Sequence, residues 1–189
     1  MTTIGFIRHG RTAWNHTGRA QGSSDIPLDE EGIVTAERLR ERLRDEQWDH
    51  VYASDLRRAY QTADIASGDH LPRPIHTDER LREIGGGLIE GTTEAERIER
   101  WGTNWRDKDL QMESAEAAAR RGLLAIADIV NNHPGERVLI VAHGTLLRLL
   151  IESMTETNDR LPLDNTSVSY VSKIDERWTC SVYNCTKHL

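Results

Sequence analysis

Two segments of the chain end in a histidine that is followed by glycine. They are "FIRHG" at residues 6–10 and "VLIVAHG" at residues 138–144, and each contains an apolar run typical of a buried strand. In an open parallel sheet, ligands bind at the carboxyl ends of the strands, so His9 and His143 would reach the same edge. One histidine at a strand end is more often structural, whereas two with the same local pattern indicate a site.

Two arginines are placed to supply positive charge at that edge. Arg8 adjoins His9, and Arg58 lies one helical turn after Ser54, at the start of the helix expected after the second strand. Arg57 and Arg58 could also form a solvated helix face. Guanidinium groups, imidazoles and the amino end of a helix all suit a tetrahedral dianion. The combination therefore predicts a pocket that holds a phosphoryl group without a metal.

The strands that must carry these residues are marked by apolar runs. We expect strands over 2–7, 48–54 and 137–143, and a short one near His76. Residues 166–174 and 178–184 alternate in polarity like the two arms of a hairpin.

Helices are expected between the strands. Asp29 should cap the first long helix, and Ser54 the second, which should stop at Gly68. Further helices are expected over 92–108, from near Glu113 to the "NNHPG" segment, and over 145–154. The buried stripe predicted for the helix after Glu113 consists of Leu123, Leu124, Ile126, Ala127 and Val130. This alternation predicts an α/β fold, a three-layer α/β/α sandwich with a mostly parallel central sheet, in a single domain spanning residues 1–189.

Length and composition exclude several classes of protein. A chain of 189 residues suits one ordinary domain, and its net charge of −7 argues against binding to nucleic acid or to an anionic membrane. Cys180 and Cys185 are too few for a disulfide scaffold and form no CxxC zinc pattern. We find no secretory signal and no apolar segment approaching the ~20 residues that span a bilayer. A cytoplasmic protein is expected.

Beyond these physical arguments, the sequence resembles the histidine phosphatase superfamily, also called the phosphoglycerate mutase-like family. The matching segments occur in the order typical of the family and span nearly the whole chain. They are "RHGRTAWNHTGRAQGSSDIPLDEEG" (8–32), "SDLRRAYQTA" (54–63), "LREIGGGLIEG" (81–91), "ES" (113–114), "VLIVAHG" (138–144) and "NTS" (165–167).

The resemblance implies a role for each matching residue. His9 would be the nucleophile that forms a phosphohistidine, and its other ring nitrogen should then donate to a backbone carbonyl that fixes the tautomer. Glu83 would protonate the leaving oxygen and then act as base for water. The phosphoryl oxygens would be bound by Arg8, Arg58 and His143, with Asn15, Gln21 and the Gly144 backbone amide lining the pocket. No cofactor and no metal are implied.

Three positions depart from the family pattern. The residue after "RHG" is commonly Glu or Gln, and here it is Arg11. Arg11 is either a rim residue facing water or an added cation for a second acidic group on the substrate. An aromatic residue is replaced by Ile89, and the glycine before "ES" by Met112. The last two changes affect local loop geometry and leave the phosphate pocket intact.

Several functions fit parts of this pattern. We expect a phosphomonoesterase of small phosphorylated metabolites, because residues 91–113 lack the dense basic insertion of the resembled mutases. A cofactor-dependent phosphoglycerate mutase is the alternative, and an inactive module that binds a phosphorylated ligand is a third. A metallohydrolase lacks support, because the sequence has no HxH or HExxH spacing.

The other histidines are expected at the surface: His16, His50, His70, His76, His133 and His188. The substrate's organic part and the oligomeric state are left open.

Overall fold

A mixed six-stranded sheet forms the centre of the molecule, in the order β3-β2-β4-β1-β5-β6. The computed structural model describes residues 1–157 and 161–189. The strands are β1 (Thr3–Arg8), β2 (His50–Ala53), β3 (His76–Thr77), β4 (Arg137–Ala142), β5 (Val168–Ile174) and β6 (Arg177–Cys185). The first four pair in parallel, and β5 and β6 extend the sheet as the predicted antiparallel hairpin. The expected sheet is confirmed.

The pairing of β1 with β4 brings the two histidine segments together. Arg8 lies opposite Ala142 in the parallel register, and the His9 N–H donates to the Ala142 carbonyl at 2.9 Å. His9 and His143 therefore leave the same carboxyl edge from adjacent strands.

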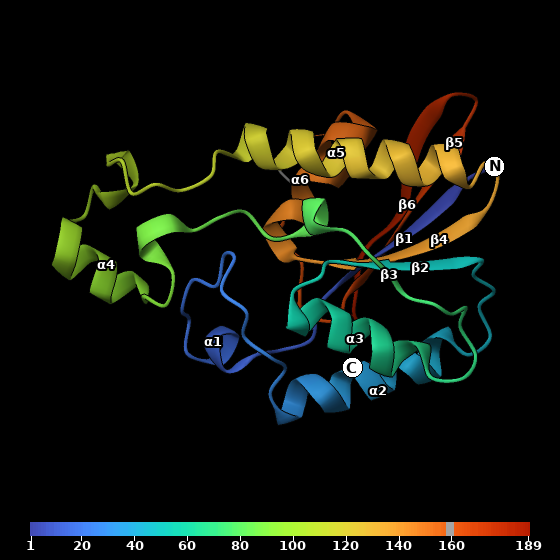
Figure 1. The fold of residues 1–189 in the computed structure, drawn as a ribbon, viewed down its shortest axis with the longest axis horizontal. Helices are drawn as coiled ribbons and strands as arrows, with labels where there is room; N and C mark the ends of the chain where they lie inside the picture. The colour runs from blue at the N-terminus through green and yellow to red at the C-terminus, as the bar shows by residue number, and fades with distance from the viewer. Residues whose placement is uncertain (158–160) are drawn as a thin grey trace.

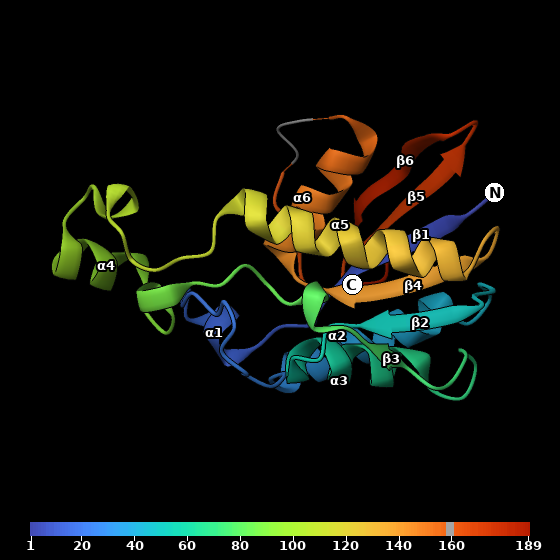
Figure 2. The ribbon, with the colours of Figure 1, turned by 45° about the horizontal axis from the view of Figure 1, so that its top comes forward.

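Helices cover both faces of the sheet, as Figures 1 and 2 show. Successive residues of β4 point to opposite sides, so Ile140 packs in the core beneath α5 and α6, while Val141 packs against α2 and α3. The helices are α1 (Ala13–His16), α2 (Glu30–Leu43), α3 (Arg57–Ser67), α4 (Glu94–Trp101), α5 (Ala115–Asn132) and α6 (Gly144–Thr155), with 3-10 turns at Glu79–Leu81, Gly87–Ile89 and Trp105–Asp107. This is the expected three-layer sandwich.

The helix caps are only partly as predicted. Asp29 caps α2, because its Oδ1 accepts the Gly32 N–H at 2.7 Å. The prediction that Ser54 caps the next helix is wrong. Leu56 is in extended conformation, so α3 begins at Arg57 without a side-chain cap, and the Ser54 hydroxyl accepts only the Leu56 N–H at 3.3 Å.

Two helices differ from the sequence prediction. The single helix expected over 92–108 is interrupted at Gly102, where a φ of 86° ends α4 before a separate 3-10 turn. In α5, Leu124 is 56% exposed and Ala127 is exposed as well, so the prediction that both lie in the buried stripe is wrong. The buried face is carried by Ala125, Ile126 and Ile129. No helix among the described residues is long and apolar enough to cross a membrane.

Segments on the carboxyl side of the parallel strands extend beyond the sandwich. In Figure 1, α1 and α4 lie at this end of the sheet, and α4 projects furthest from the body of the fold. The amino end of β1, with the chain's N-terminus, lies at the opposite end. The edge that carries His9 and His143 is therefore the one surrounded by long connecting segments.

Candidate active site

The tautomer of His9 is set by its own backbone. The side chain is 3% exposed, and its Nδ1 lies 2.7 Å from the Gly10 carbonyl oxygen. Since a carbonyl can only accept, Nδ1 carries the proton and Nε2 keeps its lone pair. The Gly10 N–H in turn donates to the Thr62 hydroxyl at 2.8 Å, which fixes the turn after β1. This is the backbone contact that the sequence analysis required of a nucleophilic histidine.

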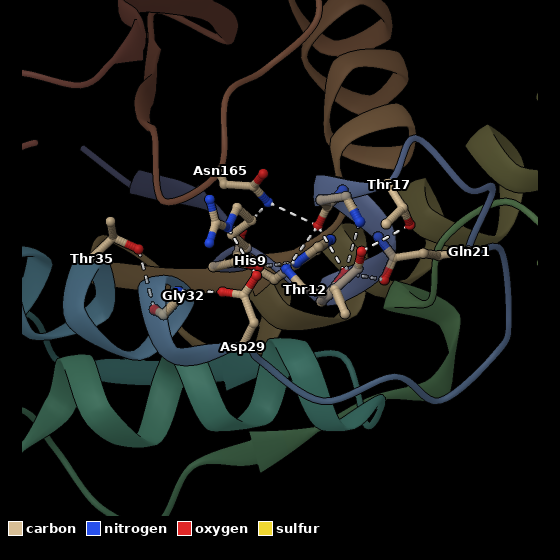
Figure 3. A network of polar contacts seen from close by, with 12 residues as sticks. His9, Thr12, Thr17, Gln21, Asp29, Gly32, Thr35 and Asn165 are labelled. Atoms are coloured by element: carbon tan, nitrogen blue, oxygen red, sulfur yellow. Dashed lines mark hydrogen bonds and ion pairs between the residues drawn. The ribbon is translucent and has the colours of Figure 1, made fainter. Parts of the chain in front are cut away.

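Asn165 holds the backbone of the same turn. Its amide donates to the His9 carbonyl at 2.9 Å and contacts the Asn15 Oδ1 at 3.4 Å, as Figure 3 shows. The Thr166 N–H also donates to the Arg8 carbonyl at 3.0 Å. No role was predicted for Asn165 from the sequence, although its "NTS" segment matches the family. Asn165 is therefore a positioning residue for the Arg8–His9 pair.

Arg58 is fully buried and faces His143 across the site. Its Nε donates to the His143 Nδ1 at 3.2 Å, so the proton of that imidazole must reside on Nε2. Its other nitrogens donate to the carbonyls of Gly22 (2.8 Å) and Ser24 (2.7 Å). Burial lowers the pKa of Arg58 to about 10, so the guanidinium is still charged at neutral pH.

The loop that receives Arg58 needs a glycine. Gly22 has a φ of 50°, and a Cβ there would lie 2.1 Å from the Glu90 Oε1. The Glu90 carboxylate uses this close approach, accepting the Ser23 N–H at 2.8 Å, the Gly86 N–H at 2.9 Å and the Ser24 hydroxyl at 2.5 Å. Glu90 thus ties two loops together beside Arg58.

Two buried N–H groups at the site have no protein partner among the described residues. They are Nε of Arg8 and Nε2 of His143. Another nitrogen of the Arg8 guanidinium donates to the Leu163 carbonyl, and the His143 ring lies 5.2 Å from the His9 ring, centroid to centroid. Buried donors in proteins are nearly always paired, so these two indicate a ligand rich in acceptors. An anion with several oxygens satisfies that requirement.

Charge and burial keep both imidazoles neutral. Burial, followed by the charges of Arg8 and Arg58, holds the pKa of His9 well below its ordinary 6.5. The pKa of His143 is lowered in the same direction, chiefly by burial and then by Arg58. The site therefore pairs two cationic guanidinium groups with a neutral His9 that can attack and a neutral His143 that can donate.

Glu83 reaches this site from the connection after β3. Its carboxylate accepts the N–H groups of Thr145 at 3.1 Å and of Leu146 at 3.0 Å, so it caps the amino end of α6. Those groups follow His143 and Gly144 directly, and the Glu83 charge acts on both Arg8 and Arg58. The structure brings Glu83 to the same edge as the two histidines.

An ion pair that the sequence analysis did not identify positions Glu83. Arg121 pairs with Glu113 at 2.8 Å, and the same guanidinium donates to the carbonyls of Arg80, Arg82 and Glu83. Glu113 also accepts the Gly85 N–H at 3.0 Å. One guanidinium thus fixes the backbone on both sides of Glu83. The "ES" segment signalled Glu113, but no local pattern marked Arg121.

Asn15 and Gln21 both point toward Thr12. The Thr12 hydroxyl donates to the Gln21 Oε1 at 2.9 Å and approaches the Asn15 Oδ1 at 3.1 Å (Figure 3). Thr12 and Asn15 form the capping box of α1. Both amide oxygens are therefore engaged within the loop, and the NH₂ ends are the groups suited to contact an anion.

The residues that depart from the family pattern are accounted for locally. Arg11 donates through Nε to the Asp29 Oδ2 at 2.8 Å, and its side chain is 38% exposed. Ile89 packs in a small cluster with Trp105 and Leu110. Met112 is exposed. The Asp29 ion pair accounts for the Arg11 charge without a substrate, and a role for Arg11 in substrate binding stays a prediction.

The buried histidines predict how stability depends on pH. Below pH 6.5 the unfolded chain takes up protons that the folded His9 and His143 do not, so the free energy of unfolding falls as pH falls. The slope approaches about 1.4 kcal/mol per pH unit for each imidazole. Urea unfolding in phosphate-free buffers at a series of pH values measures it. His143→Gln should reduce the slope and the exposed His76→Gln should not; equal slopes in wild type and His143→Gln would contradict the prediction.

The chain is similar in sequence to several known proteins. It is 32% identical over 192 residues to the uncharacterized phosphatase PhoE of Bacillus subtilis, covering 100% of this chain and 97% of that one. It is 34% identical over 200 residues to a metal-independent phosphoserine phosphatase of Arabidopsis thaliana, covering 100% and 84%. It is 33% identical over 193 residues to the probable phosphoglycerate mutase GpmB of Yersinia pestis, covering 96% and 89%.

Solved structures agree with these relatives. Bacillus stearothermophilus YhfR superposes with a TM-score of 0.90 at 34% identity, covering 100% of this chain and 99% of that one. A mycobacterial glucosyl-3-phosphoglycerate phosphatase gives a TM-score of 0.88 at 30% identity, covering 97% and 99%. An Entamoeba histolytica phosphoserine phosphatase in complex with 3-phosphoglyceric acid gives 0.84 at 25% identity, covering 100% and 99%. A family model for the histidine phosphatase superfamily (branch 1) matches residues 4–186, and the chain belongs to that superfamily.

Proposed function

We propose that this phosphatase hydrolyses phosphate monoesters of small metabolites through a phosphohistidine formed on His9. The observation that carries the proposal is the pair of buried donors, Arg8 Nε and His143 Nε2, beside an imidazole whose Nε2 is free to attack. A tetrahedral phosphoryl group offers the oxygens that these donors require. Relatives named as phosphatases support the reaction class.

In the first step, the His9 Nε2 lone pair attacks phosphorus in line with the ester oxygen. A P–N bond forms as the P–O bond breaks, and the departing alkoxide takes a proton from the Glu83 carboxyl. Arg8, Arg58 and His143 stabilise the negative charge on the three equatorial oxygens. Because these donors are already oriented by the fold, each can contribute about 3 kcal/mol to lowering the barrier.

In the second step, water attacks the phosphorus of the phosphoenzyme. Glu83, now a carboxylate, takes the proton of that water, and the P–N bond breaks to return its electron pair to His9. Inorganic phosphate leaves and Glu83 is protonated again. Splitting the hydrolysis into two displacements lets one carboxyl serve first as acid and then as base.

The low pKa of His9 suits this role. A protonated Nε2 has no lone pair, so the nucleophile must be neutral at working pH. Burial and the adjacent guanidinium charges keep it neutral far below pH 6.5. Arg121 and Glu113 act only through Glu83 and its backbone, so they are positioning residues.

The segment between Gly91 and Glu113 favours hydrolysis over phosphoryl transfer between substrates. A mutase must hold the phosphoenzyme away from water while its ligand turns. Here Arg97 and Arg106 both pair with Glu94, and both lie against the Trp105 ring, at 4.9 Å and 4.1 Å from its centroid. Because both charges are paired within the segment, they are not directed at a ligand in the active site. This supports an active site that water can enter.

The substrate class is supported by the structural neighbours. They include a glucosyl-3-phosphoglycerate phosphatase and a phosphoserine phosphatase in complex with phosphoserine or with 3-phosphoglyceric acid, and all three compounds are small phosphate esters. We propose a substrate of that size for this chain. A cytoplasmic location, expected from two isolated cysteines, remains part of the proposal.

Glu83→Gln should slow the enzyme according to the leaving group. With alkyl monophosphates we expect kcat/KM to fall about 10²–10⁴-fold, because the alkoxide loses its proton donor. With p-nitrophenyl phosphate, the leaving group needs no proton, so the rate of the first step should decrease far less. Steady-state and burst kinetics on both substrates measure the difference. The exposed Glu79→Gln is the matched control, and equal losses on both leaving groups would refute the assignment.

With 3-phosphoglycerate as substrate, free phosphate should appear as fast as the substrate is consumed. The reason is that water reaches the phosphoenzyme before a second phosphoglycerate can accept the phosphoryl group. A coupled assay that follows phosphate and 2-phosphoglycerate in the same sample measures the partition. Formation of 2-phosphoglycerate faster than phosphate would make the protein a mutase instead.

A further inference from the structure

A second group of histidines lies at the amino ends of the parallel strands. His50 is the first residue of β2, His133 follows α5, and Glu136 immediately precedes β4. The catalytic histidines leave the carboxyl ends of β1 and β4, so this group lies at the opposite end of the sheet (Figure 2). His50 and His133, expected at the surface, are partly exposed, and both contact the Glu136 carboxylate.

One carboxylate oxygen joins the two imidazoles. The Glu136 Oε2 lies 2.8 Å from the His50 Nε2 and 3.2 Å from the His133 Nδ1. All three ligand atoms lie within 4.8 Å of one another. A tetrahedral zinc site with bonds of about 2.0–2.2 Å places neighbouring ligand atoms about 3.3 Å apart. The separations in this group are those of hydrogen-bonded side chains, and the His50 and His133 rings stack with centroids 3.6 Å apart. An ion that bound all three would replace the contact between His50 and Glu136 and turn the two rings toward a common point.

The backbone presents these side chains on a rigid frame. His133 to Glu136 form a tight turn in which the Glu136 N–H donates to the His133 carbonyl at 3.3 Å. Pro134 and Gly135 occupy its centre, and the φ of 82° at Gly135 is that of a type II turn. The Gly135 N–H is also held by the Thr2 hydroxyl at 3.0 Å. The turn places residues 133 and 136 on one side without further ordering.

The start of β2 is fixed to the start of β4. The Asp49 N–H donates to the Arg137 carbonyl at 2.8 Å, and the Arg137 N–H donates to the Asp49 carboxylate at 2.8 Å. His50 and Glu136, which flank this pair of bonds, cannot drift apart. Because the backbone already holds the three residues close together, only their side chains have to be ordered around a metal.

A tyrosine occupies the position of an outer partner. The Tyr52 hydroxyl lies 2.9 Å from the His133 Nε2, the ring nitrogen that does not face Glu136. Histidines that bind metals nearly always use their second nitrogen to donate to an oxygen, which fixes the tautomer. Stacking against the His76 ring, 4.9 Å away, holds Tyr52 in place. The outer contact needed by a metal-bound His133 is thus already built.

We propose that His50, His133 and Glu136 form a binding site for a zinc-like divalent transition metal, distinct from the catalytic centre. Two imidazoles and one carboxylate are ligands that zinc accepts and that magnesium does not favour. The side chains of all three are partly exposed, at 28%, 16% and 44%, so an ion can enter and water can complete the coordination. The bound metal would clamp β2, the end of α5 and β4 together, and it takes no part in the phosphatase reaction.

The test is a zinc titration of the full-length, tag-free protein against a chromophoric chelator. We expect wild type to bind one Zn²⁺ per chain. Its affinity for Mg²⁺ should be much lower than its affinity for Zn²⁺. His133→Gln and Glu136→Gln should each weaken zinc binding by more than tenfold, and Tyr52→Phe by about tenfold. The exposed His70→Gln is the matched control and should bind like wild type.

Two further readouts make the result decisive. Cobalt should give the absorption bands of tetrahedral Co²⁺ in wild type and lose them in His133→Gln, and zinc should raise the melting temperature of wild type but not of Glu136→Gln. Phosphatase activity should be the same with and without chelator, which separates this site from the catalytic proposal. Zinc affinity that is equal in wild type and both ligand variants, or no tetrahedral cobalt spectrum in wild type, would overturn the proposal.

Discussion

The site depends on a buried positive charge that has no direct carboxylate partner among the described residues. Arg58 is fully buried, and its hydrogen bonds go to two carbonyls and to the Nδ1 of His143. Burying a guanidinium costs several kcal/mol unless good hydrogen bonds compensate. Neutral acceptors provide the hydrogen bonds but leave the positive charge in place. A dianionic ligand is the partner that this arrangement favours.

Several features of the fold follow from that constraint. The loop after β1 must bring the carbonyls of Gly22 and Ser24 to Arg58, and Glu90 holds the loop there. The same positive field lowers the pKa of His9 and of His143 and keeps both imidazoles neutral. Because Gly10 fixes one tautomer and Arg58 fixes the other, one ring offers a lone pair and the other offers a proton. The tautomer of each ring is thus set by its neighbours rather than by residue type.

Much of this arrangement could be predicted from the sequence because it is written in local patterns. Apolar runs ending in His-Gly located β1 and β4, and their parallel pairing placed His9 beside His143. Arg58 does lie near the mouth of the sheet, although α3 begins only at Arg57 and the helical turn expected after Ser54 does not form. The family resemblance located Glu83. The fold class and the gathering of these residues at one edge of the sheet could therefore be predicted from short segments, whereas their catalytic roles stay predictions.

The residues that hold the site in place could not be predicted in this way. Asn165 contacts the His9 carbonyl across 156 positions of sequence, and Arg121 reaches the Glu83 carbonyl across 38. Neither has a local pattern, because its role exists only after the sheet has formed. Ser54 and Leu124 show the opposite failure. Each fits a local rule, but the extended Leu56 and the actual inward face of α5 override it.

The central claim is that His9 carries the phosphoryl group, and trapping that adduct tests it most directly. Wild-type protein and His9→Asn are mixed with a phosphate monoester, quenched in denaturant at alkaline pH, and mapped by peptide mass spectrometry. The account predicts a phosphoryl group on the His9 peptide of the wild type that is lost in acid, and neither adduct nor turnover in His9→Asn. An adduct on a different residue, or turnover by His9→Asn at a rate near that of wild type, would contradict it.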